Sequence, residues 1–185
     1  LGVRLGVALG AVGFIGLITM IGPGAAGSML AQTAFDTASS YTLAVLPLFL
    51  FMANLMARAG IASALYDASN AVLGRVRGGL AMATVAGCAG FGAVCGSSLA
   101  TAATMGAVAM PEMKRVGYDS GLATGSVAAG GTLGILIPPS IVLVIYGTIT
   151  EQSIGDLFLA GILPGILGMV LYVVAIMIAV RLQPQ

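Results

Sequence analysis

The sequence contains no histidine and no tryptophan, and only 7% of its 185 residues are charged. Soluble domains carry about 25% charged residues, so this composition excludes a water-soluble globular protein. Without histidine, Ser-His-Asp triads, imidazole acid–base chemistry and most zinc or haem sites are excluded too. The seven Lys and Arg and the six Asp and Glu residues form no run of like charge, which argues against a nucleic-acid partner. We therefore expect a protein of the lipid bilayer that is not an enzyme.

Uncharged stretches make up most of the chain. A helix needs about 20 residues to cross a bilayer core of about 30 Å. Five uncharged stretches are long enough: residues 5–35, 37–57, 78–111, 120–150 and 157–180. The pattern predicts an all-α polytopic membrane protein.

The basic residues predict how the first stretches cross the bilayer. If Arg4 is cytoplasmic, residues 5–22 cross outward. Residues 23–40 contain no Lys or Arg and are expected to form an outer loop, after which residues 41–57 return and bring Arg58 inside. This arrangement obeys the rule that cytoplasmic loops carry the excess of Lys and Arg.

The same rule predicts that residues 78–111 fold back on themselves. A single crossing would carry Lys114 and Arg115 outside, whereas a helical hairpin keeps them on the side of Arg75 and Arg77. With the hairpin, and with the two later stretches crossing out and back, all seven basic residues lie inside.

The centre of the proposed hairpin, residues 78–112, is rich in residues that interrupt a helix. Glycines stand at positions 87, 90, 92 and 96. Ser97 and Ser98 can cap a new helix, so we expect a break near Gly96 and a second short helix that runs to Pro111. Exposed backbone inside a bilayer is tolerated where protein or a watery cavity surrounds it, which makes this tip a candidate site. The alternative is an ordinary kinked helix with small packing residues.

A second interruption is expected in residues 117–150, where two consecutive prolines stand at the middle. Pro138 and Pro139 remove two helical N–H donors, so the carbonyls of Gly134 and Ile135 are predicted to lack partners. An unsatisfied carbonyl in hydrocarbon costs several kcal/mol, and a dehydrated cation is one group that would bind it.

The prolines also favour the start of a new helix. Pro139 and Ser140 suit its first turn, whose free N–H groups and positive dipole end attract anions. Cation and anion sites side by side at mid-membrane are typical of a secondary transporter, and two interruptions at similar depth are a sequence pointer to its binding site. The alternative is a proline kink whose carbonyls bind water or the hydroxyls of Thr132 or Ser140.

No Asp, Glu, Lys, Arg or His lies within the five stretches. Proton-coupled carriers generally need such a group as a relay, so coupling to a metal ion is favoured. Sodium is the expected ion, because neutral carbonyl and hydroxyl oxygens suffice to bind it.

Several motifs, in their order along the chain, resemble one known family. They are Pro47–Met52, the pair Arg75 and Arg77 followed by Gly78–Ala81, the tip Gly96–Thr101, the segment Gly131–Ser140, and Ile154–Gly165. The chain resembles the large membrane subunit of tripartite ATP-independent periplasmic (TRAP) transporters. The likeness covers essentially the whole chain but only the first of the two inverted repeats of that subunit, so the chain alone is not expected to transport.

The resemblance implies a sodium-driven permease that imports organic acid anions, such as dicarboxylates, across the inner membrane of a bacterium or archaeon. It also implies an elevator-like transport domain, a small membrane subunit as partner and a periplasmic binding protein that delivers the substrate. A passive channel or a structural membrane scaffold remains the alternative, because either would share the hydropathy and the small-residue packing.

The resemblance also implies which residues line the sodium and substrate region. They are Ser97, Ser98 and Thr101 at the hairpin tip, and Gly131, Thr132, Gly134, Pro138, Pro139 and Ser140 on the broken helix. We expect sodium to bind mostly through backbone carbonyls, namely those of Gly134, Ile135 and Ser97.

Four regions are expected along the chain. They are two scaffold transmembrane helices in 1–58, an amphipathic interfacial helix in 59–77, a transport region in 78–150, and an external loop with a final transmembrane helix in 151–185. Cys88 and Cys95 are interpreted as small buried hydrophobic residues. Gly-x-x-x-Gly spacings at 2/6/10, 92/96, 121/125, 130/134 and 161/165 would allow close helix approach, although chance accounts for several in a chain with 28 glycines.

Overall fold

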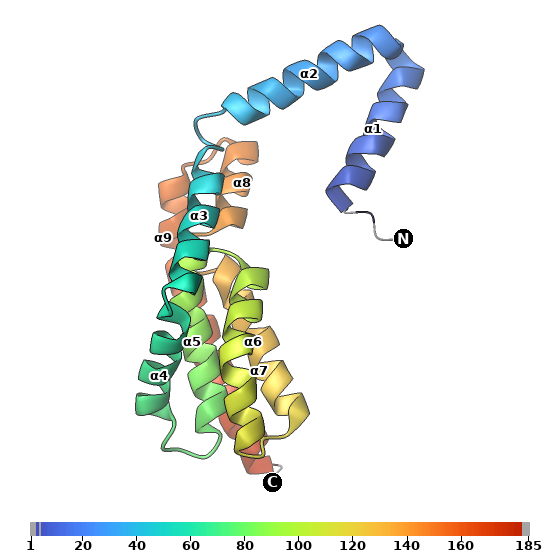
Figure 1. Cartoon of the computed structure of the whole chain (residues 1–185). Coiled ribbons are helices and arrows are strands. Elements are labelled where there is room, and N and C mark those ends of the chain that lie inside the picture. The colour runs from blue at the N-terminus through green and yellow to red at the C-terminus, as the bar shows by residue number, and fades with distance from the viewer. Residues whose placement is uncertain (1–2, 4, 183–185) are drawn as a thin grey trace. The chain divides into compact units, whose positions relative to one another are not determined.

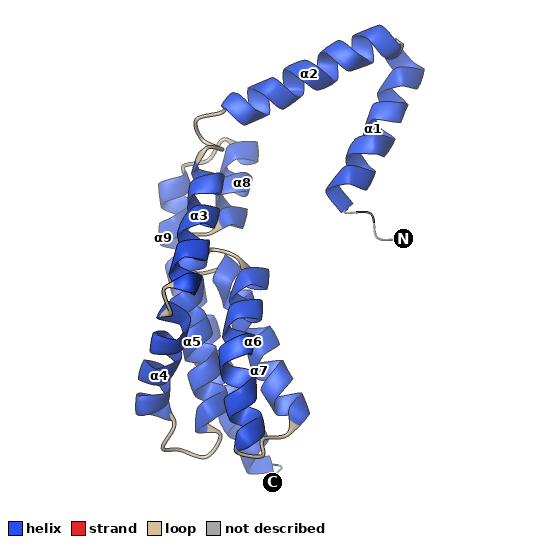
Figure 2. Ribbon diagram, viewed as in Figure 1, coloured by secondary structure: helices blue, strands red, loops and turns tan. Residues whose placement is uncertain are grey.

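The computed structural model describes residue 3 and residues 5–182, and every regular element in this part of the chain is helical (Figures 1 and 2). The helices are α1 (Leu5–Ile21), α2 (Pro23–Ser39), α3 (Val45–Arg58), α4 (Ile61–Leu73), α5 (Gly79–Cys95), α6 (Ser98–Arg115), α7 (Ser120–Thr132), the 3₁₀ helix η1 (Leu133–Ile135), α8 (Ile141–Thr150) and α9 (Ile154–Leu182). The expected all-α class is confirmed.

The helices form two compact units, Leu1–Ala44 and Val45–Gln185. The first unit contains α1 and α2. The expectation of a loop at 23–40 is wrong, because Pro23–Ser39 is a helix. Pro23 stands at its first position, where a missing N–H costs nothing, and the segment that follows is rich in alanine, the best helix former.

In the second unit, α3 and α4 are bent by 65° at the break between them. Gly60 turns the chain there with φ of 76°. Helix α4 then runs antiparallel along α5: a Cβ added to Gly87 would lie 3.6 Å from Tyr66 Cα, and one added to Gly90 would lie 3.4 Å from Leu65 Cδ2. An interfacial position for residues 59–77 stays a prediction.

Helix α9 is the longest apolar helix of the described residues. Within the described residues it is the one helix long and apolar enough to cross a membrane by itself, and α3 with α4 reaches that criterion as a bent pair. Helices α1, α5 and α8 are apolar but shorter. The stretches 78–111 and 120–150 are thus divided into short helices, as their glycines and prolines predicted.

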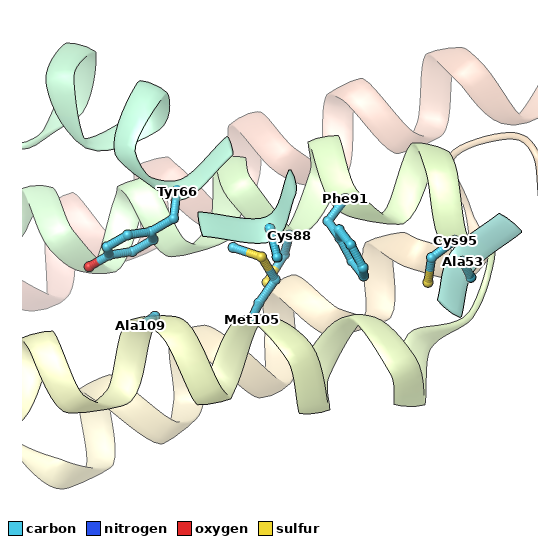
Figure 3. Close-up of a cluster of buried hydrophobic side chains, with 8 residues drawn as sticks. Ala53, Tyr66, Cys88, Phe91, Cys95, Met105 and Ala109 are labelled. Atoms are coloured by element: carbon cyan, nitrogen blue, oxygen red, sulfur yellow. The ribbon is translucent and has the colours of Figure 1, made fainter. Parts of the chain in front are cut away.

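Helix α5 lies at the centre of the second unit. On one side its residues Cys88, Phe91 and Cys95 pack with Ala53 of α3, Tyr66 of α4 and residues of α6 (Figure 3). These three α5 side chains are at most 1% exposed, so the interpretation of both cysteines as buried residues is confirmed. On its other side α5 contributes to a second core with Met113, Leu133 and Ile176.

Glycines on α9 let an irregular segment lie against its backbone. A Cβ on Gly161 would be 2.7 Å from the Leu136 carbonyl oxygen, and one on Gly165 would be 2.5 Å from Ile137 Cγ1. A Cβ on Gly92 would likewise be 2.7 Å from Gly134 Cα. Some of the Gly-x-x-x-Gly spacings therefore mark close contacts.

Other glycine spacings do not mark contacts. An added Cβ at Gly6, Gly10 or Gly125 would meet nothing within 4 Å. The Gly-x-x-x-Gly motif by itself therefore does not separate glycines at close helix contacts from glycines in open space. The large number of glycines in the chain predicted such chance matches.

The α4–α5 loop, the α6–α7 loop and the C-terminal end of α9 lie at one end of the second unit (Figure 1). The Leu80 N–H donates to the Tyr118 hydroxyl at 3.3 Å, and Gly78 lies against Val180 of α9, so two loops and the end of α9 meet there. The residues that this end carries are Arg75, Arg77, Lys114, Arg115 and Arg181. Arg58, which was expected beside them, stands at the bend between α3 and α4, because α4 separates it from this end by 13 helical residues.

We predict that Gly161→Ala lowers the stability of the chain by about 1–3 kcal/mol, since the new methyl group would collide with the Leu136 carbonyl. Gly125→Ala is the matched control, because it adds a methyl group in open space within a helix. Thermal unfolding in detergent, followed by circular dichroism, measures both. Equal melting temperatures for the two variants would contradict the observed contact of α9 with residues 136–137.

Candidate functional site

The first helix break lies between α5 and α6. Helix α5 ends at Cys95, and Gly96 terminates it with φ of 64°, a conformation that glycine adopts without strain. The side chain of Ser97 accepts a hydrogen bond from the Ala100 N–H at 3.4 Å and caps α6. The break predicted near Gly96 is confirmed.

The second helix of this pair is longer than expected. It continues past Pro111 and ends at Arg115. One proline removes a single backbone bond, and the residues after it, Glu-Met-Lys-Arg, are strong helix formers, so the helix resumes. The expected end at Pro111 is therefore wrong.

The second break lies between α7 and α8. Helix α7 tightens into η1, which ends at Ile135, and α8 begins at Ile141. The break predicted at the two prolines is confirmed. Ser140 caps the new helix with its Oγ, which accepts from the Leu143 N–H at 3.3 Å. Pro139 and Ser140 thus precede the first turn of α8 rather than form it.

The two carbonyls predicted to lack partners differ from each other. The Ser140 hydroxyl donates to the Ile135 carbonyl at 2.7 Å, which is the alternative that the sequence left open, so Ile135 has a side-chain donor in place of a helical one. Ser140 is fully buried, and its one hydroxyl serves both as donor to Ile135 and as acceptor for the cap. No donor to the Gly134 carbonyl is recorded among the described residues.

The two breaks meet. The Ile141 N–H donates to the Gly96 carbonyl at 3.2 Å, which joins the start of α8 to the end of α5. A Cβ on Gly96 would lie 2.5 Å from the Pro139 carbonyl oxygen, so only glycine allows this approach. We call the region where Gly96–Thr101 and Gly131–Ile141 touch the break junction.

Gly134 also faces the start of α6. A Cβ there would lie 2.7 Å from Thr101 Oγ1 and 3.0 Å from the Ser97 carbonyl oxygen. A Cβ on Gly131 would lie 3.3 Å from the Ser98 carbonyl oxygen. The backbone at Ser97 and Ser98, the side chain of Thr101 and the two glycines are thereby brought together, as the prediction of one site requires.

Two of the predicted residues lie on another side. Thr132 points toward α9, where its Oγ1 is 3.1 Å from the Tyr172 hydroxyl oxygen. Pro138 packs on α9 too, with its Cγ 3.6 Å from the position of a Cβ on Gly161. These residues border the break junction without facing the Ser97–Thr101 turn.

Cys95 of α5 contacts the break junction, and the sequence did not reveal this contact. Its Sγ lies 3.4 Å from the Ser97 carbonyl oxygen and 3.3 Å from Thr101 Oγ1. From the sequence Cys95 was interpreted as a small buried hydrophobic residue, although its place directly before Gly96 and Ser97 indicates that it ends a helix beside the tip.

The chemistry of the break junction comes from backbone groups and hydroxyls. The C-terminal ends of α5 and η1 and the N-terminal ends of α6 and α8 all lie there. Helix C-termini present carbonyl oxygens, which attract cations, and helix N-termini present N–H groups, which attract anions. The described residues contain no cluster of three or more His, Cys, Asp or Glu that could hold a metal ion.

Charged groups stand far from the break junction on α6. Glu112 and Arg115 form an exposed ion pair in its last turn, with two hydrogen bonds of 2.6 and 3.1 Å. The hydrogen bond from Arg115 lowers the pKa of the Glu112 carboxyl. A helix rises about 1.5 Å per residue, so this pair acts at the basic end and not at the break junction.

A known protein family matches almost the whole chain. Residues 1–184 match the family described as "Tripartite ATP-independent periplasmic transporter, DctM component". The chain is 48% identical over 151 residues to the C4-dicarboxylate TRAP transporter large permease protein DctM of Pseudomonas aeruginosa, a match that covers 81% of the chain and 35% of that protein.

Two further relatives bear other substrate names. The ectoine/5-hydroxyectoine TRAP transporter large permease protein UehC of Ruegeria pomeroyi is 37% identical over 93% of the chain and 40% of its own length. The isethionate TRAP transporter permease protein DctMQ of Oleidesulfovibrio alaskensis is 37% identical over 87% of the chain and 25% of its own length. The chain therefore spans well under half the length of these relatives.

We predict that Ser140→Ala destabilises the start of α8 by about 1–3 kcal/mol, because it removes the cap and leaves the Ile135 carbonyl without its donor. Hydrogen exchange at Ile141–Leu143, read by mass spectrometry, should be faster in the variant. Thr148→Ala is the control: Thr148 lies on the same helix and only bonds back to the Val144 carbonyl. Unchanged exchange in Ser140→Ala would contradict the capping role.

Proposed function

Because the chain belongs to the DctM component family of tripartite ATP-independent periplasmic transporters, we propose that it forms part of the large permease of a sodium-coupled importer of organic acid anions. The family is one of polytopic membrane transporters and not of enzymes. Since the chain spans 35% of its Pseudomonas aeruginosa relative, transport is assigned to the complete permease.

The observation that carries this proposal is the break junction. Two helices end there and two begin, and the Ile141–Gly96 hydrogen bond joins them. Such a point offers carbonyls for a cation and amides for an anion without a charged side chain. A channel or a scaffold has no need of two converging breaks, so the junction favours a carrier over both.

Sodium is proposed as the coupling ion because residues 96–101 and 131–141 include no Asp, Glu, Lys, Arg or His. The Gly134 carbonyl and the oxygens of Ser97 and Thr101 are the proposed ligands, since Gly134 lies against both residues. The Ile135 carbonyl already accepts from Ser140, so it would bind sodium only through its second lone pair.

The substrate is proposed to bind at the starts of α6 and α8. Two amides of α8 are already used, Ile141 by the Gly96 carbonyl and Leu143 by Ser140 Oγ. The amides of Ser98, Leu99 and Val142 remain for an anion. Relatives are named for C4-dicarboxylates, ectoines and isethionate, which all carry an acidic group. An organic acid such as a dicarboxylate fits this chemistry.

We further propose that residues 78–112 form a re-entrant hairpin and 117–150 a broken transmembrane helix, in one half of an elevator-type transporter. The α4–α5 loop and the end of α6 lie at the same end of the second unit (Figure 1), and they carry Arg75, Arg77, Lys114 and Arg115, which supports this arrangement. In this proposal 1–58 and 151–185 supply flanking membrane helices. The proposed partners are a small membrane subunit and a periplasmic binding protein, and the proposed location is the inner membrane of a bacterium or archaeon.

The hairpin predicts membrane sidedness. In a variant without Cys88 and Cys95, single cysteines at positions 75 and 114 should react with an impermeant thiol reagent from the cytoplasmic side only. A cysteine at position 153, in the loop before α9, should react from the opposite side only. Labelling of positions 75 and 114 from opposite sides would exclude the hairpin.

Uptake by the complete permease tests the coupling. Reconstituted into proteoliposomes with its partners, the permease should take up radiolabelled succinate saturably and only with a sodium gradient. We predict that replacing Pro138 and Pro139 with alanine raises the half-saturating sodium concentration about tenfold, the equivalent of 1.4 kcal/mol, because the helix can then recover its carbonyls.

The control for the proline variant is Pro47→Ala, a replacement in α3 outside the break junction. Sodium-independent uptake by the native permease would refute sodium coupling. Normal sodium dependence in the proline variant would instead refute the role of the break in binding sodium.

A further inference from the structure

Cys95 is a buried thiol at the last position of α5, with its side chain on the side of α6 (Figure 3). Its Sγ lies 3.4 Å from the Ser97 carbonyl oxygen and 3.3 Å from Thr101 Oγ1. The oxygens of both residues are proposed sodium ligands, and Gly134, which carries the third proposed ligand, lies against both. The thiol therefore contacts two of the three groups proposed to bind the ion.

Thr101 is unusual in what its hydroxyl contacts. A threonine inside a helix commonly donates its proton to the carbonyl four residues earlier. Several threonines of the described helices do so, namely Thr84, Thr124, Thr148 and Thr150. For Thr101 that carbonyl belongs to Ser97, yet the recorded contact of the Thr101 hydroxyl is with Cys95 Sγ. The Ser97 carbonyl is thus spared a bond from this hydroxyl.

The number of available protons sets the direction of these hydrogen bonds. A carbonyl only accepts, so the contact with Ser97 takes the single proton of the Cys95 thiol. Thr101 must then donate its own proton to Sγ. Both lone pairs of Thr101 Oγ1 remain, and this oxygen lies 2.7 Å from the position of a Cβ on Gly134. The hydroxyl thus turns its proton toward α5 and keeps its lone pairs for the side of Gly134.

The Ser97 carbonyl has one strong and one weak partner. One of its lone pairs accepts the Thr101 N–H at 3.0 Å. The other accepts from the thiol at the longer distance of 3.4 Å. Because a thiol is a weak donor, a cation displaces it more easily than it would displace a hydroxyl.

We propose that Cys95 is a positioning residue of the ion site. By accepting the Thr101 proton, it keeps the lone pairs of Thr101 and the second lone pair of the Ser97 carbonyl available for sodium. This role rests on the proposed sodium-coupled function and adds to it a residue that does not itself bind the ion.

Replacing Cys95 with alanine should weaken sodium binding. Without Sγ, the Thr101 hydroxyl is expected to bond back to the Ser97 carbonyl, as other threonines of the chain do, and to compete with the ion there. The sodium concentration at half-saturation should rise about threefold to tenfold, the effect of one competing hydrogen bond. Cys95→Ser should fall between the native protein and Cys95→Ala, because serine accepts the Thr101 proton but donates to Ser97 more strongly than a thiol.

The test uses sodium alone as the probe. The complete permease is purified in detergent, and its melting temperature is measured against increasing sodium chloride, with choline chloride keeping the ionic strength constant. The variants are Cys95→Ala, Cys95→Ser, Thr101→Val, the double variant Cys95→Ala with Thr101→Val, and Cys88→Ala. Cys88→Ala is the matched control, since it removes a buried thiol from the same helix and Cys88 has no recorded hydrogen bond within the described chain.

Thr101→Val removes a ligand, so its sodium midpoint should rise, and the double variant should show no further rise because Cys95 acts through Thr101. Cys88→Ala should keep the native midpoint. A native midpoint in Cys95→Ala, a midpoint in Cys95→Ser as high as in Cys95→Ala, or additive effects in the double variant would overturn the inference and leave the proposed function standing. No response of the native protein to sodium would instead overturn the proposed function.

The S–H stretching vibration provides a readout that a purely structural role of Cys95 would not change. Infrared difference spectra between the Cys88→Ala permease and the same protein with Cys95→Ser added isolate the Cys95 band. Sodium should shift this band toward its frequency without a hydrogen bond, because the ion takes the Ser97 lone pair from the thiol. A band that saturating sodium leaves in place would refute the positioning role.

Discussion

A backbone hydrogen bond from the Ile141 N–H to the Gly96 carbonyl joins the two helix breaks of the second unit. It joins the first amide of one helix to the last turn of another that lies 45 positions earlier in the sequence. Both groups are of the kind that a helix end leaves without partners, so each break satisfies part of the other. The glycines at the junction follow from this bond. Any side chain at Gly96 would strike the Pro139 carbonyl, and any at Gly134 would strike Thr101 and Ser97.

The breaks themselves were predictable because they are local chemistry. Gly96 followed by serines, and two prolines in succession, interrupt a helix whatever surrounds them. That the breaks touch depends on the packing of α5, α6 and α7, which no local pattern encodes. The Ile135 carbonyl shows the same limit. It accepts a hydrogen bond from the Ser140 hydroxyl, but the sequence left open whether Thr132 or Ser140 would supply the donor.

The residues that were missed have identifiable causes. Cys95 and Tyr172 were hidden because both stand in apolar runs, where a single weakly polar side chain resembles a filler. Their contacts with Thr101 and Thr132 are tertiary. Residues 23–40 were assigned to an outer loop from charge alone, although Pro23 and the alanines that follow it favoured a helix. Charge distribution predicts sidedness and is a poor guide to secondary structure.

The segments that form the break junction, 96–101 and 131–141, carry no charged side chain, and this has a consequence for coupling. In the proposed function, the bound sodium would be the largest local charge, as is general for ions in uncharged sites. An anion bound about 4 Å away would be attracted by about 4 kcal/mol at an effective dielectric constant of about 20. Sodium would then strengthen anion binding, and by linkage the anion would strengthen sodium binding equally. A fixed lysine or arginine at the junction would attract the anion without sodium and would weaken this mutual dependence. A site built from carbonyls, amides and hydroxyls is therefore suited to coupled transport because it supplies no charge of its own.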